Sequence, residues 1–392
     1  MKIMTDQLEK ILVFLGSLII SLNLSAELSY DQFSNSIDNL FNSRVNKPGC
    51  AVGVIKDGIY IHNKGYGMAN LEHDIAITPD TIFRVGSVSK QFTAMLIAIL
   101  EERGKLSFDD EMKKYIPDLY NYKKKVTINH MIHHFSGLGD YTTYNDYPNT
   151  FKNAINEKFR WGNEDYFSND EFHQIIKDLP LIRDPEIKFW YSNTGYALLG
   201  LVAQNITGMT LRELAQKEIF KPLQMSNSIF NDDVNLTIKN RADAYSPRKG
   251  YKDEYKINVT NLSWVGDGGI YTSLNDFIKW DQNFYSNKLG MNEPSLIKTM
   301  EQSYLETKVN RKSQDLENEN KDQHTYAFAQ NLSYFNGLKK WSHSGSWVGW
   351  LAHYTRFEEI GFSIVVFCNT DEMDATEINN EIIELYFKLD GN

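Results

Sequence analysis

The sequence has no cluster of basic residues interleaved with aromatic ones. Its 41 lysines and arginines are outnumbered by 51 aspartates and glutamates, and the formal net charge is −10. This charge argues against nucleic acid or an anionic membrane surface as a partner, because both are negatively charged themselves. We therefore expect a small-molecule or peptide ligand rather than a polyanion.

Long hydrophobic runs are also scarce, since only residues 11–24 are almost wholly apolar, and they are too short to span a bilayer comfortably. With the small residues that follow, this run is typical of a secretory signal peptide over residues 1–26. We therefore expect a periplasmic or secreted protein with no stable membrane span after cleavage. Asp6 and Glu9 offset the basic residues of the leading segment, so an uncleaved N-terminal anchor stays open. No cysteine follows the run, which excludes a lipoprotein attachment point there.

The chain has only two cysteines, Cys50 and Cys368. Cys50 begins one predicted strand and Cys368 ends another, so antiparallel pairing of these strands would make the two sulfurs neighbours. Export would allow them to form a disulfide. The alternative is two buried thiols that pack as small apolar side chains.

Hydrophobic side chains make up 42% of the residues and charged ones 23%, which is ordinary globular composition. The length of 392 residues allows one large domain or two intertwined subdomains, and we find no internal repeats. Periodicity and turn residues predict helices over 30–43, 91–100, 127–135, 194–204 and 377–387, and strands over 51–55, 59–62, 326–332, 338–342, 350–357 and 362–368.

This order predicts a mixed α/β (α+β) domain over residues 27–392. Residues 30–85 and 325–392 would form an antiparallel sheet flanked by the terminal helices, and residues 86–324 an inserted helical and loop subdomain. The active cleft would lie at their junction. Residues 139–185 are rich in aromatics, Asn and Asp and predict loops that wall this cleft. Residues 307–323 are polar and charged and predict an exposed, mobile excursion.

Ser87 and Lys90 are the most informative pair of residues in the sequence. Positions i and i+3 share one face of a helix, so the Lys90 amine would lie against the Ser87 hydroxyl. A serine needs such a proton acceptor to become a nucleophile. The same spacing also occurs at Ser246–Lys249 and Ser295–Lys298. Only Ser87 stands between a predicted strand and a long apolar helix, which favours it over the other two.

Two further motifs follow in the chain. Tyr191-Ser192-Asn193 stands directly before an apolar helix, and His343-Ser344-Gly345 lies on a predicted strand that leads into Ser346. In this order and spacing, Ser87-x-x-Lys90, Tyr191-x-Asn193 and His343-x-Gly345 resemble the penicillin-recognising serine hydrolases. The branch concerned contains class C β-lactamases, D-alanyl-D-alanine carboxypeptidases and family VIII esterases. The resemblance covers roughly residues 30–390 and implies the β-lactamase/transpeptidase-like fold.

The resemblance also implies a role for each motif. Ser87 would form an acyl-enzyme, while Lys90 and Tyr191 would accept and return the proton. Asn193 would tie Lys90 to a substrate amide, and His343, Ser344 and Gly345 would line the substrate-binding strand. We expected Gly345 to leave room for substrate there. Backbone N–H groups of Ser87 and Ser346 would hold the oxyanion.

One departure from the family pattern bears on the substrate. The β-lactamase branch usually has lysine where this chain has His343, and lysine offers a permanent positive charge to a substrate carboxylate. Histidine in this place is common among the peptidases and esterases of the resembling families. We therefore expect hydrolysis of D-amino-acid peptides or carboxyl esters, with a class C-type β-lactamase as the alternative. A non-catalytic protein that binds such ligands or a partner is the alternative of another class.

The reaction needs no cofactor and no metal. His130, His133 and His134 lie close together in the sequence, but no carboxylate or cysteine nearby completes a ligand set. For four further residues, a role in packing and a role in the site are equally compatible with the sequence. They are the tryptophans at 341, 347 and 350 and Asp267, which lies in a glycine-rich turn.

Overall fold

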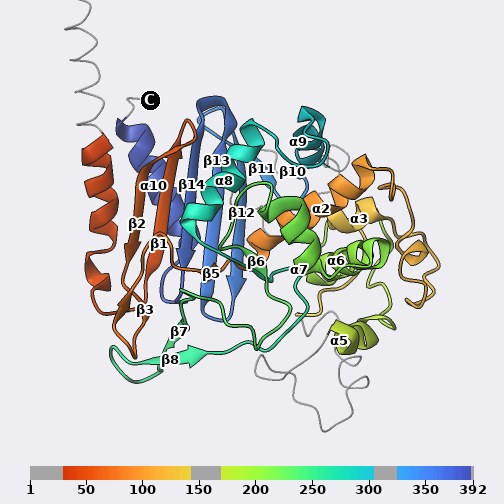
Figure 1. Cartoon of the computed structure of the whole chain (residues 1–392), viewed down its shortest axis with the longest axis horizontal. Coiled ribbons are helices and arrows are strands. Elements are labelled where there is room, and N and C mark those ends of the chain that lie inside the picture. Colours follow the sequence, from red (N-terminus) through yellow and green to blue (C-terminus); the bar gives the residue numbers. More distant parts are fainter. Residues whose placement is uncertain (1–29, 143–168, 304–324, 390–392) are drawn as a thin grey trace, which may run out of the picture.

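The computed structural model describes residues 30–142, 169–303 and 325–389 (Figure 1). The predicted signal over 1–26, the excursion over 307–323 and most of the region 139–185 lie outside these residues. Within the described ranges, no helix combines the length and the apolar character that a bilayer crossing requires.

A seven-stranded antiparallel sheet forms the frame of the molecule, with strand order β10-β11-β12-β13-β14-β1-β2. Its strands are β1 Cys50–Lys56, β2 Ile59–Tyr66, β10 Thr325–Tyr326, β11 Asn331–Phe335, β12 Leu338–Trp347, β13 Trp350–Phe357 and β14 Phe362–Cys368. The first and last segments of the chain thus share one sheet, as predicted. Cys50 is the register partner of Cys368, and the two form a disulfide between β1 and β14.

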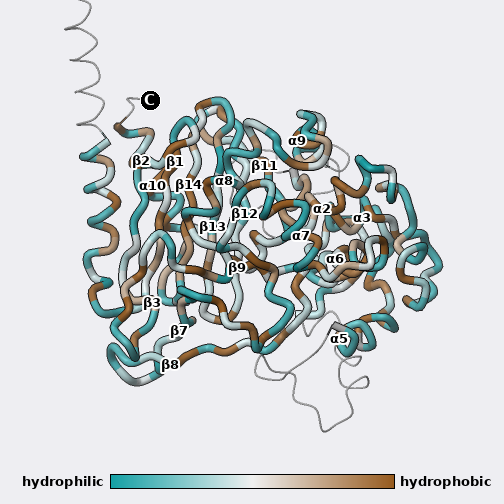
Figure 2. Tube along the Cα trace, viewed as in Figure 1, coloured by the Kyte–Doolittle hydropathy of each residue, from teal (hydrophilic) through white to brown (hydrophobic). Residues whose placement is uncertain are grey.

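The terminal helices cover one face of this sheet. A helix over residues 30–40 and α10 Ala375–Leu389 pack on the apolar side chains of β1 and β14 that point to that side. In Figure 2 the first helix alternates between polar and apolar residues along its length, which is the pattern of a helix with one buried stripe. The other face of the sheet contacts α8 Leu274–Tyr285 and the segment that carries Ser87.

The inserted region is mainly helical. It contains α2 Lys90–Glu102, α3 Ile128–Ile132, α5 Asn169–Ile176, α6 Asn193–Thr207, α7 Leu211–Ala215 and α9 Pro294–Met300. Three short sheets lie beside the main one, namely β3 Met68–Asn70 with β4 Ile75–Ala76, β5 Phe83–Arg84 with β9 Ile270–Thr272 and β6 Ile229–Phe230, and β7 Ala244–Pro247 with β8 Tyr255–Asn258. Single turns lie in the inserted region at η2 Gly86–Ser89, η3 Met112–Lys114 and η4 Gln216–Phe220, and in the frame at η1 Asn42–Arg44 and η6 Glu358–Ile360.

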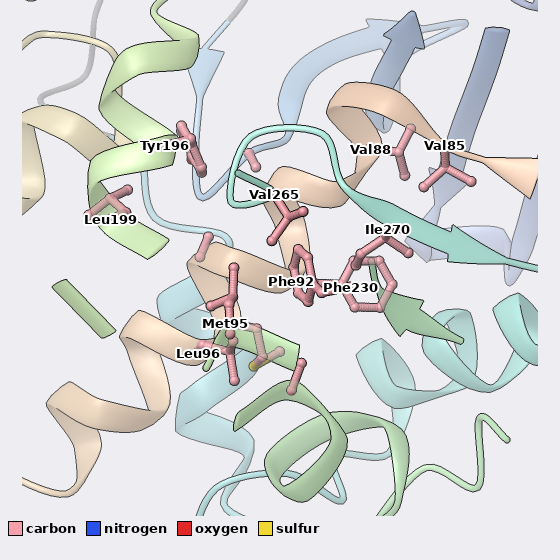
Figure 3. Close-up of a cluster of buried hydrophobic side chains, with 14 of the residues drawn as sticks. Val85, Val88, Phe92, Met95, Leu96, Tyr196, Leu199, Phe230, Val265 and Ile270 are labelled. Atoms are coloured by element: carbon pink, nitrogen blue, oxygen red, sulfur yellow. The ribbon is translucent and has the colours of Figure 1, made fainter. Parts of the chain in front are cut away.

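Helix α2 runs through the middle of the apolar core. Every residue from Lys90 to Leu100 is buried. In Figure 3, Phe92, Met95 and Leu96 of α2 lie among side chains of α6, β6 and the loop before β9. A helix enclosed on all sides has little freedom to move, so it can hold the residues at its start in one geometry.

The predicted strands over 350–357 and 362–368 are confirmed as β13 and β14. The single strand predicted over 326–332 is wrong, because β10 ends at Tyr326 and β11 begins at Asn331. Ala329 between them has a φ of +56°, a backbone conformation that interrupts an extended strand. Alanine carries no turn signal, so the sequence pattern could not reveal this break.

Candidate active site

Ser87 lies on η2, the tight turn that leads from β5 into α2. Gly86 makes this turn possible, since it has a φ of +50°. A Cβ added to Gly86 would also lie 2.7 Å from the backbone nitrogen of Ser346 on β12. The glycine therefore lets the turn pass directly beneath the strand.

The structure brings Lys90 against Ser87, as the spacing predicts. Lys90 is fully buried, and its Nζ donates to Ser87 Oγ at 3.0 Å, Asn193 Oδ1 at 2.6 Å and the carbonyl oxygen of Asp267 at 2.7 Å. These acceptors match the three protons of an ammonium group. In the neutral form, the same amine keeps two protons for Asn193 and Asp267 and turns its lone pair toward Ser87.

Asn193 and Tyr191 reach the site from the start of α6. Ser192 caps this helix by accepting the N–H of Gly195, which places Asn193 as its first residue. Asn193 Nδ2 donates to Asp140 Oδ2 at 2.8 Å, so the amide joins Lys90 to a buried carboxylate. The Tyr191 ring centre lies 5.0 Å from Lys90 Nζ. The cation and the aromatic ring thus meet at the ring face.

The loop over residues 266–270 supports the segment that carries the nucleophile. Besides Lys90, three side chains of this segment bond to the loop backbone. Arg84 Nε donates to Gly268 O, Thr93 Oγ1 donates to Gly266 O, and Ser89 Oγ accepts the N–H of Ile270. The glycine-rich stretch thus has a structural role, since its backbone anchors the segment of Ser87. The sequence pattern alone left that role open.

Strand β12 lies directly on the turn of Ser87, and this corrects the expected reason for Gly345. A Cβ at position 345 would collide with the carbonyl oxygen of Val85 and lie 3.1 Å from Ser87 N. The glycine therefore leaves room for the nucleophile turn rather than for substrate. The close approach sets the backbone of Ser346 beside that of Ser87, where the family resemblance expects the two oxyanion donors.

The expectation that His343 binds substrate also needs correction. His343 is 4% exposed, and both ring nitrogens have protein partners. Its Nδ1 contacts Ser344 O at 2.6 Å, and its Nε2 contacts the Tyr326 hydroxyl at 3.0 Å. Burial, followed by the charge of Lys90, lowers the pKa of His343 to about 4, so the ring is neutral near pH 7. It offers neither a charge nor a free donor to a substrate.

Ser344 also lies apart from the pocket. Side chains alternate along a strand, so Ser344 projects from the sheet face opposite to that of Gly345, and it is exposed there. Its carbonyl oxygen accepts a hydrogen bond from the ring Nδ1–H of His343. Ser346, which is also exposed, projects from the same face two residues later, so the expected substrate contact of Ser344 stays a prediction.

A pocket of about 250 Å³ opens above the nucleophile. It is lined by Ser87, Thr142, Asn193, Asp267, Gly268, Ser346 and Trp347. The Trp347 ring is held from two sides, because its Nε1 donates to Thr260 and the Arg84 guanidinium lies 4.7 Å from its centre. Trp341 and Trp350 are buried instead.

Sequence reasoning missed several of these wall residues. Thr142 and Asp140 carry no motif, and only the fold brings them beside Asn193. Asp267 lies in a recognisable glycine-rich turn, and its Oδ2 accepts the Tyr141 hydroxyl at 2.7 Å. Burial raises the pKa of the Asp267 carboxyl, opposed by the charge of Lys90.

The three neighbouring histidines make hydrogen bonds to protein groups. His130 lies between the N–H of Thr127 and Glu186, and with Thr127 it forms the capping box of α3. His133 contacts two backbone carbonyl oxygens. Within the described ranges, no three histidine, cysteine or acidic residues are grouped as metal ligands would be.

The fold and this site define a class of protein. The family model described as "Beta-lactamase" matches residues 37–386, so the chain belongs to the β-lactamase family and is a serine hydrolase. A D-aminopeptidase of Gluconobacter oxydans is 29% identical over 260 residues, which are 64% of this chain and 46% of that protein. This chain thus spans about half the length of that relative.

Solved structures share the fold. The octameric penicillin-binding protein homologue from Pyrococcus abyssi superposes with a TM-score of 0.75 at 24% identity, covering 91% of this chain and 77% of that one. A β-lactamase/D-alanine carboxypeptidase from Yersinia pestis gives 0.71 at 19% identity, covering 94% and 99%. The β-lactamase/transpeptidase-like fold expected from the sequence is confirmed.

Proposed function

We propose that this protein is an exported hydrolase that cleaves carboxyl esters or D-amino-acid peptides through an acyl-enzyme on Ser87. The observation that carries the proposal is the 3.0 Å contact between Ser87 Oγ and Lys90 Nζ at the wall of an open pocket. A serine with a buried lysine as its hydrogen-bond partner is the arrangement that nucleophilic catalysis requires.

The proposed reaction begins with neutral Lys90. Ser87 Oγ attacks the substrate carbonyl carbon and its proton passes to Lys90 Nζ, while the N–H groups of Ser87 and Ser346 stabilise the oxyanion. The tetrahedral intermediate expels the leaving alcohol or amine, which takes the proton. Water then attacks the acyl ester and gives its proton to Lys90. Lys90 returns this proton to Ser87 Oγ as the acid product leaves. Tyr191, beside Lys90, shares the proton transfer.

The charge of the pocket favours substrates without a carboxylate next to the scissile bond. His343 is neutral, and among the described residues that line the pocket none is basic and the one acidic residue is Asp267. A β-lactam or a C-terminal D-alanine carries a carboxylate, and this carboxylate would find no cationic partner among these lining residues. This ranks carboxyl esters first. D-peptides come second, supported by the similarity to a D-aminopeptidase.

Export is supported by two observations. The apolar run at 11–24 is typical of a secretory signal, and Cys50 and Cys368 form a disulfide. Disulfides form and persist mainly in oxidising compartments such as the periplasm. We propose a periplasmic or secreted location on these grounds.

The test compares purified wild-type protein with Ser87→Ala on short-chain p-nitrophenyl esters and on a fluorescent penicillin. We expect ester hydrolysis by the wild type and a loss of at least about 1,000-fold in Ser87→Ala. Intact mass should show an acyl adduct on the wild type alone. Ser295→Ala is the matched control, because Ser295 has the same spacing to Lys298 but lies exposed on α9.

Full activity in Ser87→Ala would contradict the assignment of Ser87 as the nucleophile. A persistent penicilloyl adduct with little ester turnover would favour the carboxypeptidase alternative, and rapid loss of β-lactam absorbance the β-lactamase alternative. Binding of such ligands without any covalent chemistry would favour the non-catalytic reading.

A further inference from the structure

A chain of buried polar groups lies behind the active site. The N–H of Ser192 donates to His134 Nδ1 at 3.1 Å, and His134 Nε2 contacts the Tyr326 hydroxyl at 3.1 Å. The same hydroxyl contacts His343 Nε2 at 3.0 Å, and His343 Nδ1 contacts Ser344 O at 2.6 Å. His134, Tyr326 and His343 are each at most 4% exposed. The chain therefore links the loop of Tyr191 to β12 across the core.

One set of proton positions satisfies these four contacts. A backbone N–H can only donate, so His134 accepts at Nδ1 and carries its proton on Nε2, which donates to the Tyr326 oxygen. A carbonyl oxygen can only accept, so His343 carries its proton on Nδ1 and accepts the Tyr326 O–H at Nε2. Burial lowers the pKa of both imidazoles, which keeps both rings neutral as this arrangement demands.

The two ends of the chain carry different parts of the catalytic site. At one end, Ser192 lies between Tyr191 and Asn193, and the Tyr191 ring packs on His134 with centres 4.3 Å apart. At the other end, His343 is two residues from Gly345, which lies on the turn of Ser87. The Tyr326 hydroxyl joins the two histidines by hydrogen bonds.

We propose that Tyr326 is a positioning residue that sets the place of Tyr191 and Asn193 relative to β12 and its oxyanion donor. At 1% exposed it does not reach substrate, so it acts through the two histidines. This inference rests on the proposed function of the site. It also explains why His343 is turned away from substrate, since its Nε2 is used by Tyr326.

The test is Tyr326→Phe, which keeps the ring and removes the hydroxyl. His134 then loses an acceptor and His343 loses a donor. We expect the maximal rate of acylation by a p-nitrophenyl ester to fall about 10- to 100-fold, because small misplacements of reacting groups are costly. KM should stay within about twofold, and the burst should still titrate one Ser87 per chain.

Tyr354→Phe is the matched control. Tyr354 is a buried tyrosine on β13 whose hydroxyl donates to Asp281 Oδ1 at 2.6 Å, away from the pocket residues. It should lose stability without losing acylation rate. Equal rates for Tyr326→Phe and the wild type would overturn the proposal, and so would an equal loss in both variants.

A second readout does not depend on turnover. ¹⁵N chemical shifts of labelled histidine should show the Nδ1–H form of His343 and the Nε2–H form of His134, and Tyr326→Phe should disturb both. If the wild type fails to acylate with any ester, the proposed function fails, and these shifts alone decide the positioning role. Unchanged shifts in Tyr326→Phe would overturn it.

Discussion

At the scale of single residues, Asn193 connects the two ionisable groups Lys90 and Asp140. Its Oδ1 accepts from Lys90, and its Nδ2 donates to the buried Asp140. The side chain thus links the Lys90 amine to the Asp140 carboxyl group and holds both in place. The family resemblance implied the contact with Lys90, but Asp140 has no motif and only the tertiary structure shows it.

Asn193→Ala should therefore impair catalysis more than stability. The change removes a hydrogen bond to a charged lysine and leaves Asp140 without one donor. We expect kcat/KM for ester hydrolysis to fall about 10- to 100-fold, equivalent to about 1.5–3 kcal/mol. Asn205→Ala on the same helix is the control, because its amide bonds an exposed backbone carbonyl far from Lys90. Equal kinetics for the two variants would contradict the role given to Asn193.

At the scale of elements, the contact between β12 and η2 sets the backbone of Ser346 against that of Ser87, the two proposed oxyanion donors. The strand and the turn approach until only glycine fits at positions 86 and 345. The sequence motif indicated a glycine on the substrate strand, but a one-dimensional pattern does not show which neighbour occupies the space of the missing side chain. That neighbour is the backbone of Val85.

Gly345→Ala tests this contact. The added methyl group meets fixed backbone, so β12 must move away from the turn and take the Ser346 N–H with it. We expect kcat to fall at least about 10-fold and the free energy of unfolding to fall by about 1–3 kcal/mol. Ser342→Ala, three residues earlier on the same strand and outside the pocket lining, should change neither quantity. Normal kcat in Gly345→Ala, measured with the same ester, would show that the strand position is not critical.

At the scale of the whole molecule, buried histidines couple stability to pH. Burial lowers the pKa to about 4 for His62, His133 and His343 and to about 3 for His353. Below pH 6.5 the unfolded chain therefore binds protons that the folded chain excludes. The free energy of unfolding from these groups is complete above pH 6.5 and falls as the pH drops toward 4. Asp267 and Asp281, whose pKa is raised by burial, act in the opposite direction.

His353→Gln measures the contribution of one histidine to this pH dependence of the free energy of unfolding. Between pH 7 and pH 5 a single histidine of this kind changes the free energy of unfolding by about 1–2 kcal/mol. Urea unfolding at both values should therefore show a smaller loss at pH 5 for His353→Gln than for the wild type, by about that amount. Thr355→Val on the same strand removes a hydroxyl that bonds Asn379, which does not titrate, and should keep the wild-type difference. The same difference in all three proteins would refute the assignment.

The sequence by itself predicted the pairing of Ser87 with Lys90 and most of the strands along the chain. These depend on local spacing, since a three-residue interval places two side chains on one helix face and apolar alternation indicates a strand. Tertiary structure alone decided the direction of His343, the neighbour of Gly345 and the link through Tyr326. Each of these depends on contacts between segments distant in the chain, and which hydrogen-bond partner a buried imidazole finds is settled only when those segments pack together.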